Sequence, residues 1–173
     1  AAGSLSFTDA VVLVNRRGQL MQDAVPLGEG AMAAILGLER QTVIAVCREV
    51  QLQVGLVQAV NYNCPGQIVI AGKTEAVEIA AEKLKAAGAK KTVILPVSAP
   101  FHSSLMQPAA DKLAIELEKV VIGDAKIPVV ANYNSEIVRA GRTIKKLLVR
   151  QAANPILWED CMQQMITYGA TTF

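Results

Sequence analysis

Apolar positions along residues 28–97 follow two different spacings, and each spacing predicts one kind of element. Short continuous apolar runs predict buried strands at 31–36, 56–62, 67–71 and 92–97. Apolar residues three or four positions apart predict two helices between these strands. The first helix carries Val43, Val46, Cys47 and Val50, and the second carries Val77, Ala80, Ala81 and Leu84 before a stop at Gly88.

The resulting order, β-α-β-β-α-β, is that of the split βαβ unit of ferredoxin-like domains. We therefore predict that residues 28–97 form a ferredoxin-like small lobe in a protein of the α/β class. The turn between the second and third strands is placed at 63–66, where asparagine, proline and glycine occur together.

Residues 1–27 and 98–173 flank this unit, and we predict that they form part of a second, large lobe. A helix follows Ser6, whose spacing from Asp9 resembles a capping box. The apolar positions of this helix are Phe7, Val11 and Val14. A long helix follows Pro100, with an apolar face made of Met106, Ala109, Ala110, Leu113, Leu117 and Val120.

The remaining elements are predicted from shorter patterns. Residues 127–131 suit a strand, and helices are expected near 143–152 and 156–168. Residues 171–173 look like the first residues of another strand. Helices near both ends have apolar faces without an obvious local sheet to cover, so we expect the large lobe to be only partly present.

Composition excludes several classes of protein. Hydrophobic residues make up 52% of the 173 positions and charged residues 18%, which indicates a buried core rather than disorder. The net charge of +2 is too small to indicate binding to nucleic acid or to an anionic membrane, and no apolar run approaches transmembrane length. The three cysteines lack metal-ligand spacing, so no structural zinc is expected, and they suit a reducing cytoplasm.

His102 is the only histidine, and it lies between a predicted strand and a predicted helix. Catalytic groups of α/β proteins often lie at such junctions. The positive end of a helix favours neutral imidazole, which suits a general base. A structural or surface histidine remains the alternative interpretation.

Arg17 and Gln151 each continue an apolar helix face. Arg17 shares its face with Val14 and Met21, and a guanidinium there can bind a carboxylate with two hydrogen bonds. The alternative is an arginine whose stem packs on the core while its head lies in water. Gln151 follows Ile144, Leu147 and Leu148 on one stripe, which suits either a buried hydrogen-bonded amide or part of a site.

Four other polar residues are weaker candidates. Asn61 and Asn63 lie beside the predicted turn, and turn chemistry alone explains them. Lys90 and Lys91 begin the last strand of the small lobe, where they could meet phosphates but a solvated pair is the simpler interpretation.

The chain contains no G-x-S-x-G sequence, the elbow that presents a nucleophilic serine in many acyl-transferring enzymes. Ser98, Ser103 and Ser104 lie near His102 in the sequence. A serine adjacent in sequence seldom has the geometry for activation by the same histidine.

Four segments, in order and spanning nearly the whole chain, resemble the malonyl-CoA:acyl-carrier-protein transacylases of type II fatty acid synthesis. They are RRGQLMQDAVPLGEGAMAAILGL, NYNCPGQIVIAG, LPVSAPFHSSLMQPAADKL and LLVRQAANPILWED. The resemblance implies an α/β-hydrolase-like large lobe with an inserted ferredoxin-like small lobe. It also implies that a family member has further sequence before Ala1, including the serine elbow, and after Phe173.

The resemblance implies a role for each matched residue. His102 matches the catalytic histidine that activates the serine and later deprotonates the carrier thiol. Arg17 matches the arginine that holds the malonate carboxylate. Gln151 matches a glutamine whose segment orients the histidine and the acyl group. Residues implied to lie near the acyl pocket or the pantetheine path are Met21, Asn61, Asn63, Lys90 and Lys91, and the pair Phe101-His102 resembles the form associated with malonyl selection.

The implied reaction is ping-pong transfer of malonyl from coenzyme A to the phosphopantetheine thiol of acyl carrier protein, in the cytoplasm and without a further cofactor or metal. Because the serine is absent, we expect the isolated chain to be inactive and prone to associate. Two alternatives stay open: a non-catalytic ferredoxin-like binding module, and a malonyl-loading domain of a polyketide synthase.

Overall fold

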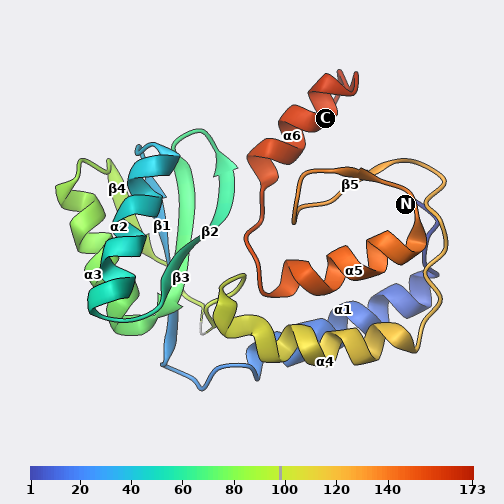
Figure 1. Cartoon of the computed structure of the whole chain (residues 1–173), viewed down its shortest axis with the longest axis horizontal. Coiled ribbons are helices and arrows are strands. Elements are labelled where there is room, and N and C mark those ends of the chain that lie inside the picture. The colour runs from blue at the N-terminus through green and yellow to red at the C-terminus, as the bar shows by residue number, and fades with distance from the viewer. Residues whose placement is uncertain (98) are drawn as a thin grey trace.

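The structure is a computed structural model that describes residues 1–97 and 99–173, so Ser98 lies outside the described residues. The chain is of the α/β class, as predicted, and Figure 1 shows a sheet-containing unit beside a group of helices. In the first unit the elements are β1 (Gly30–Leu36), α2 (Arg40–Gln53), β2 (Val57–Cys64), β3 (Gln67–Lys73), α3 (Thr74–Ala86) and β4 (Lys91–Ile94). This is the predicted β-α-β-β-α-β order.

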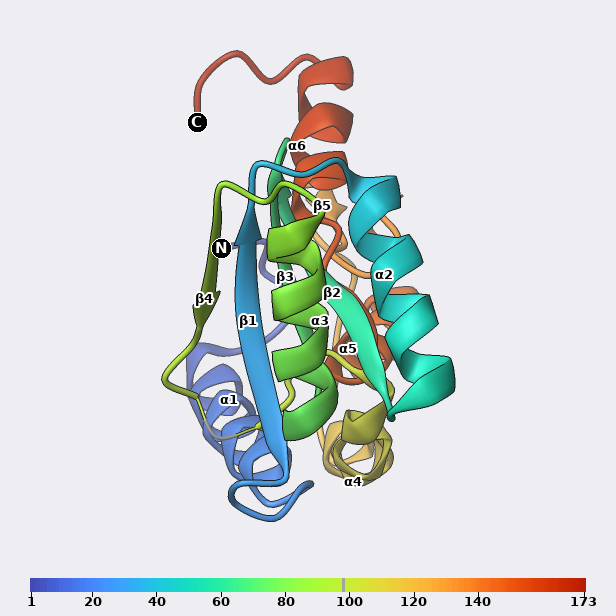
Figure 2. The same ribbon diagram turned by 90° about the vertical axis from the view of Figure 1, so that its left-hand side faces the viewer.

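The four strands form one sheet in the order β2-β3-β1-β4, and all neighbouring pairs are antiparallel. Helices α2 and α3 cover one face of it (Figure 2). Alternate residues of β1, including Ala33 and Ile35, point into the core under these helices. That core also takes Val43, Cys47 and Val50 of α2 and Val77, Ala80 and Leu84 of α3, which are the positions predicted from the helical spacing.

The opposite face of the sheet holds a smaller apolar cluster. Met32, Val60, Val69 and Ala71 are buried there, and Leu95 and Phe101 pack against them. The loop that follows β4 therefore crosses this face, and this crossing brings residues 99–103 next to the sheet.

Three of the other helices form a second apolar core, which also takes Met106 of the short 3-10 helix Ser104–Met106. They are α1 (Phe7–Gln22), α4 (Gln107–Glu118) and α5 (Gly141–Ala152), and α4 packs against both of the others (Figure 1). The first half of the predicted capping box is confirmed, because Ser6 is the N-cap and the Asp9 N–H donates to its Oγ over 3.1 Å, while the Asp9 carboxylate accepts from the Ser6 hydroxyl. The apolar stripe of α1 is nevertheless exposed, with Phe7 85%, Val11 52% and Val14 69% accessible.

Two predicted elements end earlier than expected, and a third does not form. The strand predicted at 92–97 ends at Ile94, because Pro96 has no N–H to continue the ladder. The helix predicted to reach Val120 ends at Glu118, although Val120 still packs on the second core. Residues 171–173 form no strand, since no strand among the described residues pairs with them.

Two further boundaries were wrong in another way. The strand predicted at 127–131 is only β5 (Val129–Val130), and it pairs with β6 (Ile137–Val138), which the sequence pattern did not show. Asn63, predicted in a turn, lies in β2, and the turn is limited to residues 65 and 66.

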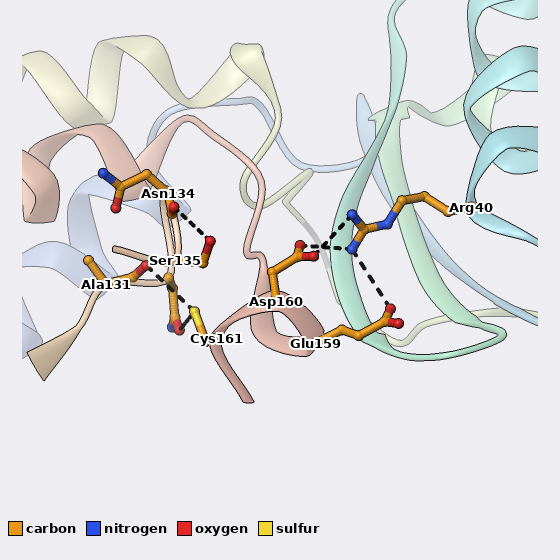
Figure 3. Close-up of polar contacts among 8 residues, drawn as sticks. Arg40, Ala131, Asn134, Ser135, Glu159, Asp160 and Cys161 are labelled. Atoms are coloured by element: carbon orange, nitrogen blue, oxygen red, sulfur yellow. Dashed lines mark hydrogen bonds and ion pairs between the residues drawn. The ribbon is translucent and has the colours of Figure 1, made fainter. Parts of the chain in front are cut away.

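Ion pairs attach helix α6 (Trp158–Thr167) to helix α2 (Figure 3). The Arg40 guanidinium donates to both carboxylate oxygens of Asp160, at 2.9 and 3.4 Å, and lies 3.7 Å from the Glu159 carboxylate. It also stacks on the Tyr62 ring, 4.1 Å from the ring centroid.

No helix within residues 1–97 and 99–173 is long and apolar enough to cross a membrane.

Two glycines allow a matched test of the packing. A Cβ at Gly72 would lie 2.7 Å from Val57 Cα and closer still to the Leu56 carbonyl oxygen, whereas a Cβ at Gly18 would meet nothing within 4 Å. We predict that Gly72→Ala lowers the free energy of unfolding by about 2–3 kcal/mol, while Gly18→Ala raises it by about 0.5–1 kcal/mol because alanine favours the helix. Urea denaturation checks both, and equal effects would contradict the described β2–β3 contact.

Candidate active site

A pocket of about 370 Å³ opens where α1, the sheet and the loop after β4 meet. It is lined by Arg17, Gly18, Met21, Met32, Asn61, Phe101 and His102. Its apolar walls come from the second core, through Met21, and from the smaller cluster on the open face of the sheet, through Met32. The pocket brings the only histidine together with an arginine that lies 85 residues away in the sequence.

A β-bulge places Asn61 in this pocket. The pairing of β2 with β3 steps from Ala59 opposite Ile70 to Asn61 opposite Val69, which leaves Val60 as the extra residue. Val60 belongs to the apolar cluster on the pocket side, so the bulge lets Asn61 face that side as well. Tyr62 then returns to the helix-covered face.

The loop before α4 holds His102 in an unusual conformation. Its φ is +62°, in the left-handed region that residues other than glycine seldom adopt. Neighbouring hydrogen bonds support it: Ser103 Oγ donates to the Pro100 carbonyl over 2.7 Å, and the Ser104 N–H donates to Gln58 Oε1 over 2.9 Å. Gly30 lets Pro100 approach, since a Cβ there would lie 2.7 Å from Pro100 Cγ.

Backbone groups at the end of α5 and just after it hold the imidazole of His102. Nδ1 lies 2.9 Å from the backbone carbonyl oxygen of Gln151. A carbonyl can only accept, so Nδ1 carries the hydrogen and Nε2 of the neutral ring keeps its lone pair. Burial lowers the pKa of His102 below its ordinary value, an effect opposed by the backbone carbonyl of Gln151 and reinforced by the charge of Arg17. The ring is thus prepared to accept a proton at Nε2.

The two adjacent arginines of α1 differ in their surroundings. The Arg16 side chain is bound to the Glu116 carboxylate at 3.4 Å. Arg17 is half-buried, and no residue within 1–97 and 99–173 gives it a hydrogen bond or an ion pair. Burial lowers the pKa of Arg17 as well, but arginine stays protonated at neutral pH. A half-buried guanidinium without a counter-charge is a receptor for an anion.

The predicted site residues divide into those that line the pocket and those that do not. Arg17, Met21, Asn61 and His102 line it together. Gln151 contacts His102 through its backbone carbonyl, and the residue also lines a neighbouring pocket together with Trp158.

Three other candidates lie away from this pocket. Asn63 follows Asn61 by two positions in β2 but does not line the pocket. The stem of Lys90 lies beside Gly37, and Lys91 pairs with Leu36 at the far end of β1 from Met32. The structure therefore gives these lysines no contact with His102 or Arg17.

Sequence reasoning missed Gly18, Met32 and Gln58. Gly18 had a detectable signal. A glycine inside a helix lowers the stability of that helix, so its presence in a predicted helix suggests another reason for it, such as room beside a site. Met32 and Gln58 had none, since each depends on which face of the sheet a strand residue occupies. Among the nearby serines, the Ser103 hydroxyl is buried and already donates to Pro100, so it is not placed as a nucleophile.

This pocket places a proton acceptor beside a guanidinium that can bind an anion, and comparison with known proteins shows the family. A family model described as the acyl transferase domain matches residues 1–173, so the chain belongs to that family. More particularly, the chain is similar to proteins named malonyl CoA-acyl carrier protein transacylase. It is 47% identical to that of Bacillus subtilis over 173 residues, covering 100% of this chain and 55% of the relative. It is 48% identical to that of Escherichia coli K12 over 168 residues, covering 97% and 54%.

Solved structures give the same result. The fold matches an acyl-carrier-protein S-malonyltransferase from Burkholderia pseudomallei with a TM-score of 0.96 and 50% identity, over 98% of this chain and 55% of that one. It also matches the malonyl-transacylase in a complex with a type II PKS acyl-carrier protein, with a TM-score of 0.94 and 46% identity over 98% and 54%. The chain thus spans about half the length of the relatives it matches.

The lowered pKa of His102 predicts a pH dependence of stability. The unfolded chain binds this proton at about the ordinary pKa of 6.5, whereas the folded chain binds it only at lower pH. The contribution of His102 to the free energy of unfolding is therefore fully present above pH 6.5. It is lost as the pH falls from 6.5 through the pKa of the folded chain. Because His102 is the only histidine, NMR titration of its ring signals measures the pKa directly, and His102→Gln should remove this part of the pH dependence of unfolding.

Proposed function

We propose that this chain supplies the histidine and the carboxylate-binding arginine of an enzyme that transfers malonyl from malonyl-CoA to the phosphopantetheine thiol of acyl carrier protein. One observation carries the proposal: Arg17, unpaired within the described residues, lines one pocket with a histidine whose Nε2 is free to accept a proton. The relatives' names point to the same substrate and carrier.

In the proposed reaction His102 moves protons. Its Nε2 accepts the proton of a serine hydroxyl as the oxygen attacks the thioester carbonyl, and the proton then goes to the leaving thiolate of coenzyme A. In the second half, Nε2 takes the proton of the carrier thiol as sulfur attacks the acyl-serine. The C–O bond breaks, and the serine oxygen recovers that proton. The serine is supplied from outside the 173 residues, which contain no G-x-S-x-G sequence.

Arg17 explains the choice of acyl group. A malonyl group brings a carboxylate that can pair with the half-buried guanidinium. An acetyl group would leave that charge desolvated and unpaired, and such a mismatch lowers affinity more than the loss of a favourable contact would. Met21 and Met32 supply apolar walls beside the charge, and Asn61 supplies a neutral amide for the thioester end.

The domain organisation follows from the same proposal. Residues 28–97 are the ferredoxin-like small lobe, whose sheet order and antiparallel pairing suit that description. Residues 1–27 and 98–173 are part of an α/β-hydrolase-like large lobe, with the active site where the two lobes meet. The enzyme needs no cofactor of its own, because the two thiols carry the acyl group, and it acts in the cytoplasm.

Arg17 variants test the carboxylate assignment. We predict that Arg17→Ala weakens binding of malonyl-CoA to the chain by at least about tenfold, equivalent to about 1.4 kcal/mol. Binding of acetyl-CoA should not weaken and should tighten, because the substitution removes the charge that an acetyl group leaves unpaired. Arg16→Ala is the matched control, since Arg16 pairs with Glu116 outside the pocket, and it should bind malonyl-CoA as the unaltered chain does. Calorimetric titration measures all three, and equal losses in the two variants would contradict the assignment.

The purified 173-residue chain should not form malonyl-carrier protein, because a histidine without its serine has no covalent acceptor for the acyl group. Incubation with labelled malonyl-CoA and acyl carrier protein, followed by gel analysis, measures this. A protein extended to the length of the relatives should form the labelled carrier. Transfer by the 173-residue chain above the background hydrolysis rate would refute the need for an external serine.

A further inference from the structure

Arg17 and His102 share a pocket that contains no acidic side chain among the described residues. The other lining residues are Gly18, Met21, Met32, Asn61 and Phe101, all uncharged. Protonation of His102 would therefore place a second positive charge in a partly desolvated pocket that already holds a guanidinium. Like charges in such surroundings oppose each other's formation.

We propose that Arg17 has a second role beyond holding the acyl group: without an anionic partner it suppresses protonation of His102, and a bound carboxylate removes this suppression. The first half rests only on the geometry of the pocket. The second half rests on the proposed function, because it takes the carboxylate of a malonyl group as the ligand of Arg17.

Among the described residues, Arg17 is the one charged group recorded as acting against protonation of His102, in addition to burial. The Gln151 carbonyl, from the end of α5, and the backbone of Asn154 both favour the imidazolium, and neither changes its charge when a ligand binds. Met32 and Asn61 of the sheet are neutral. Burial lowers the pKa of His102 most, and Arg17 is the charged side chain that lowers it further.

The consequence for catalysis is that the base responds to the substrate. Each half of the proposed reaction passes through an imidazolium, when Nε2 holds the proton taken from the hydroxyl or the thiol. A malonyl carboxylate on Arg17 stabilises that imidazolium, whereas an acetyl group leaves the guanidinium charge uncompensated. Discrimination against acetyl groups would then appear in the rate of proton transfer as well as in binding.

The single histidine allows a direct test on this chain. The pKa of His102 is measured by NMR titration in the unaltered chain, Arg17→Gln, Arg17→Lys and Arg16→Gln, with backbone spectra confirming that each variant is folded. We expect a higher pKa in Arg17→Gln, no rise in Arg17→Lys because the charge is kept, and no rise in Arg16→Gln because Arg16 lies outside the pocket. An unchanged pKa in a folded Arg17→Gln variant would overturn the proposal.

The ligand arm uses monomethyl malonate, which has one carboxylate and a neutral ester in place of the thioester. Saturating ligand should raise the pKa of His102 in the unaltered chain towards that of ligand-free Arg17→Gln. Binding that depends on Arg17 but leaves the pKa of His102 unchanged would overturn the second half of the proposal, in which a bound carboxylate removes the suppression. It would leave the proposed function intact. Absence of Arg17-dependent binding would overturn the proposed function itself, while a raised pKa in Arg17→Gln would still support the suppression.

Discussion

The pairing of β2 with the segment after α5 is the contact on which the site depends. The Ile156 N–H donates to the Val60 carbonyl over 2.8 Å, and the Tyr62 N–H donates to the Ile156 carbonyl over 2.9 Å. These bonds satisfy the edge of β2 at the bulge, where its own ladder with β3 is interrupted. They also attach the sheet to the end of α5, and this end carries the carbonyl that binds His102.

A cluster of Arg40, Tyr62, Glu159 and Asp160, here called the Arg40 cluster, strengthens the same junction from the other side of the sheet. Its guanidinium joins α2 to Asp160 and Glu159 of α6 while stacking on Tyr62 of β2. Since Tyr62 is adjacent to Asn61, the cluster holds the strand where one residue faces the pocket and the next faces the helices. Because these ion pairs are about a third exposed, we attribute to them orientation rather than a large share of stability.

The sequence predicts the features of this fold that depend on neighbouring residues, and it does not predict those that depend on contacts between distant elements. The order of elements and the buried positions of α2 and α3 depend on local periodicity, so the sequence was sufficient for them. The hairpin of β5 and β6 was missed because two-residue strands have no periodicity to detect. The placement of Arg17, Met21 and His102 in one site came from resemblance to a family, since no local pattern links residues on separate elements.

The geometry around His102 was beyond sequence reasoning for a physical reason. The contact with the Gln151 carbonyl joins residues 49 positions apart and uses a backbone atom, which every residue type possesses. Gln151 could therefore be selected as a candidate for its side chain, whereas the recorded contact with His102 uses its backbone. Asn61 is a similar case, because its direction depends on a bulge that a strict period of two does not allow.

The same burial acts on the two basic groups of the pocket in different ways. Desolvation lowers the pKa of both, but the ordinary pKa of histidine, 6.5, lies close to neutral pH, whereas that of arginine lies far above it. Near neutral pH the histidine can therefore release its proton and lose the cost of a buried charge, whereas the arginine stays protonated. One partly desolvated pocket thus produces a neutral base beside a cation without a partner. An anionic ligand that pairs with Arg17 would compensate the cation while leaving the base free to accept a proton.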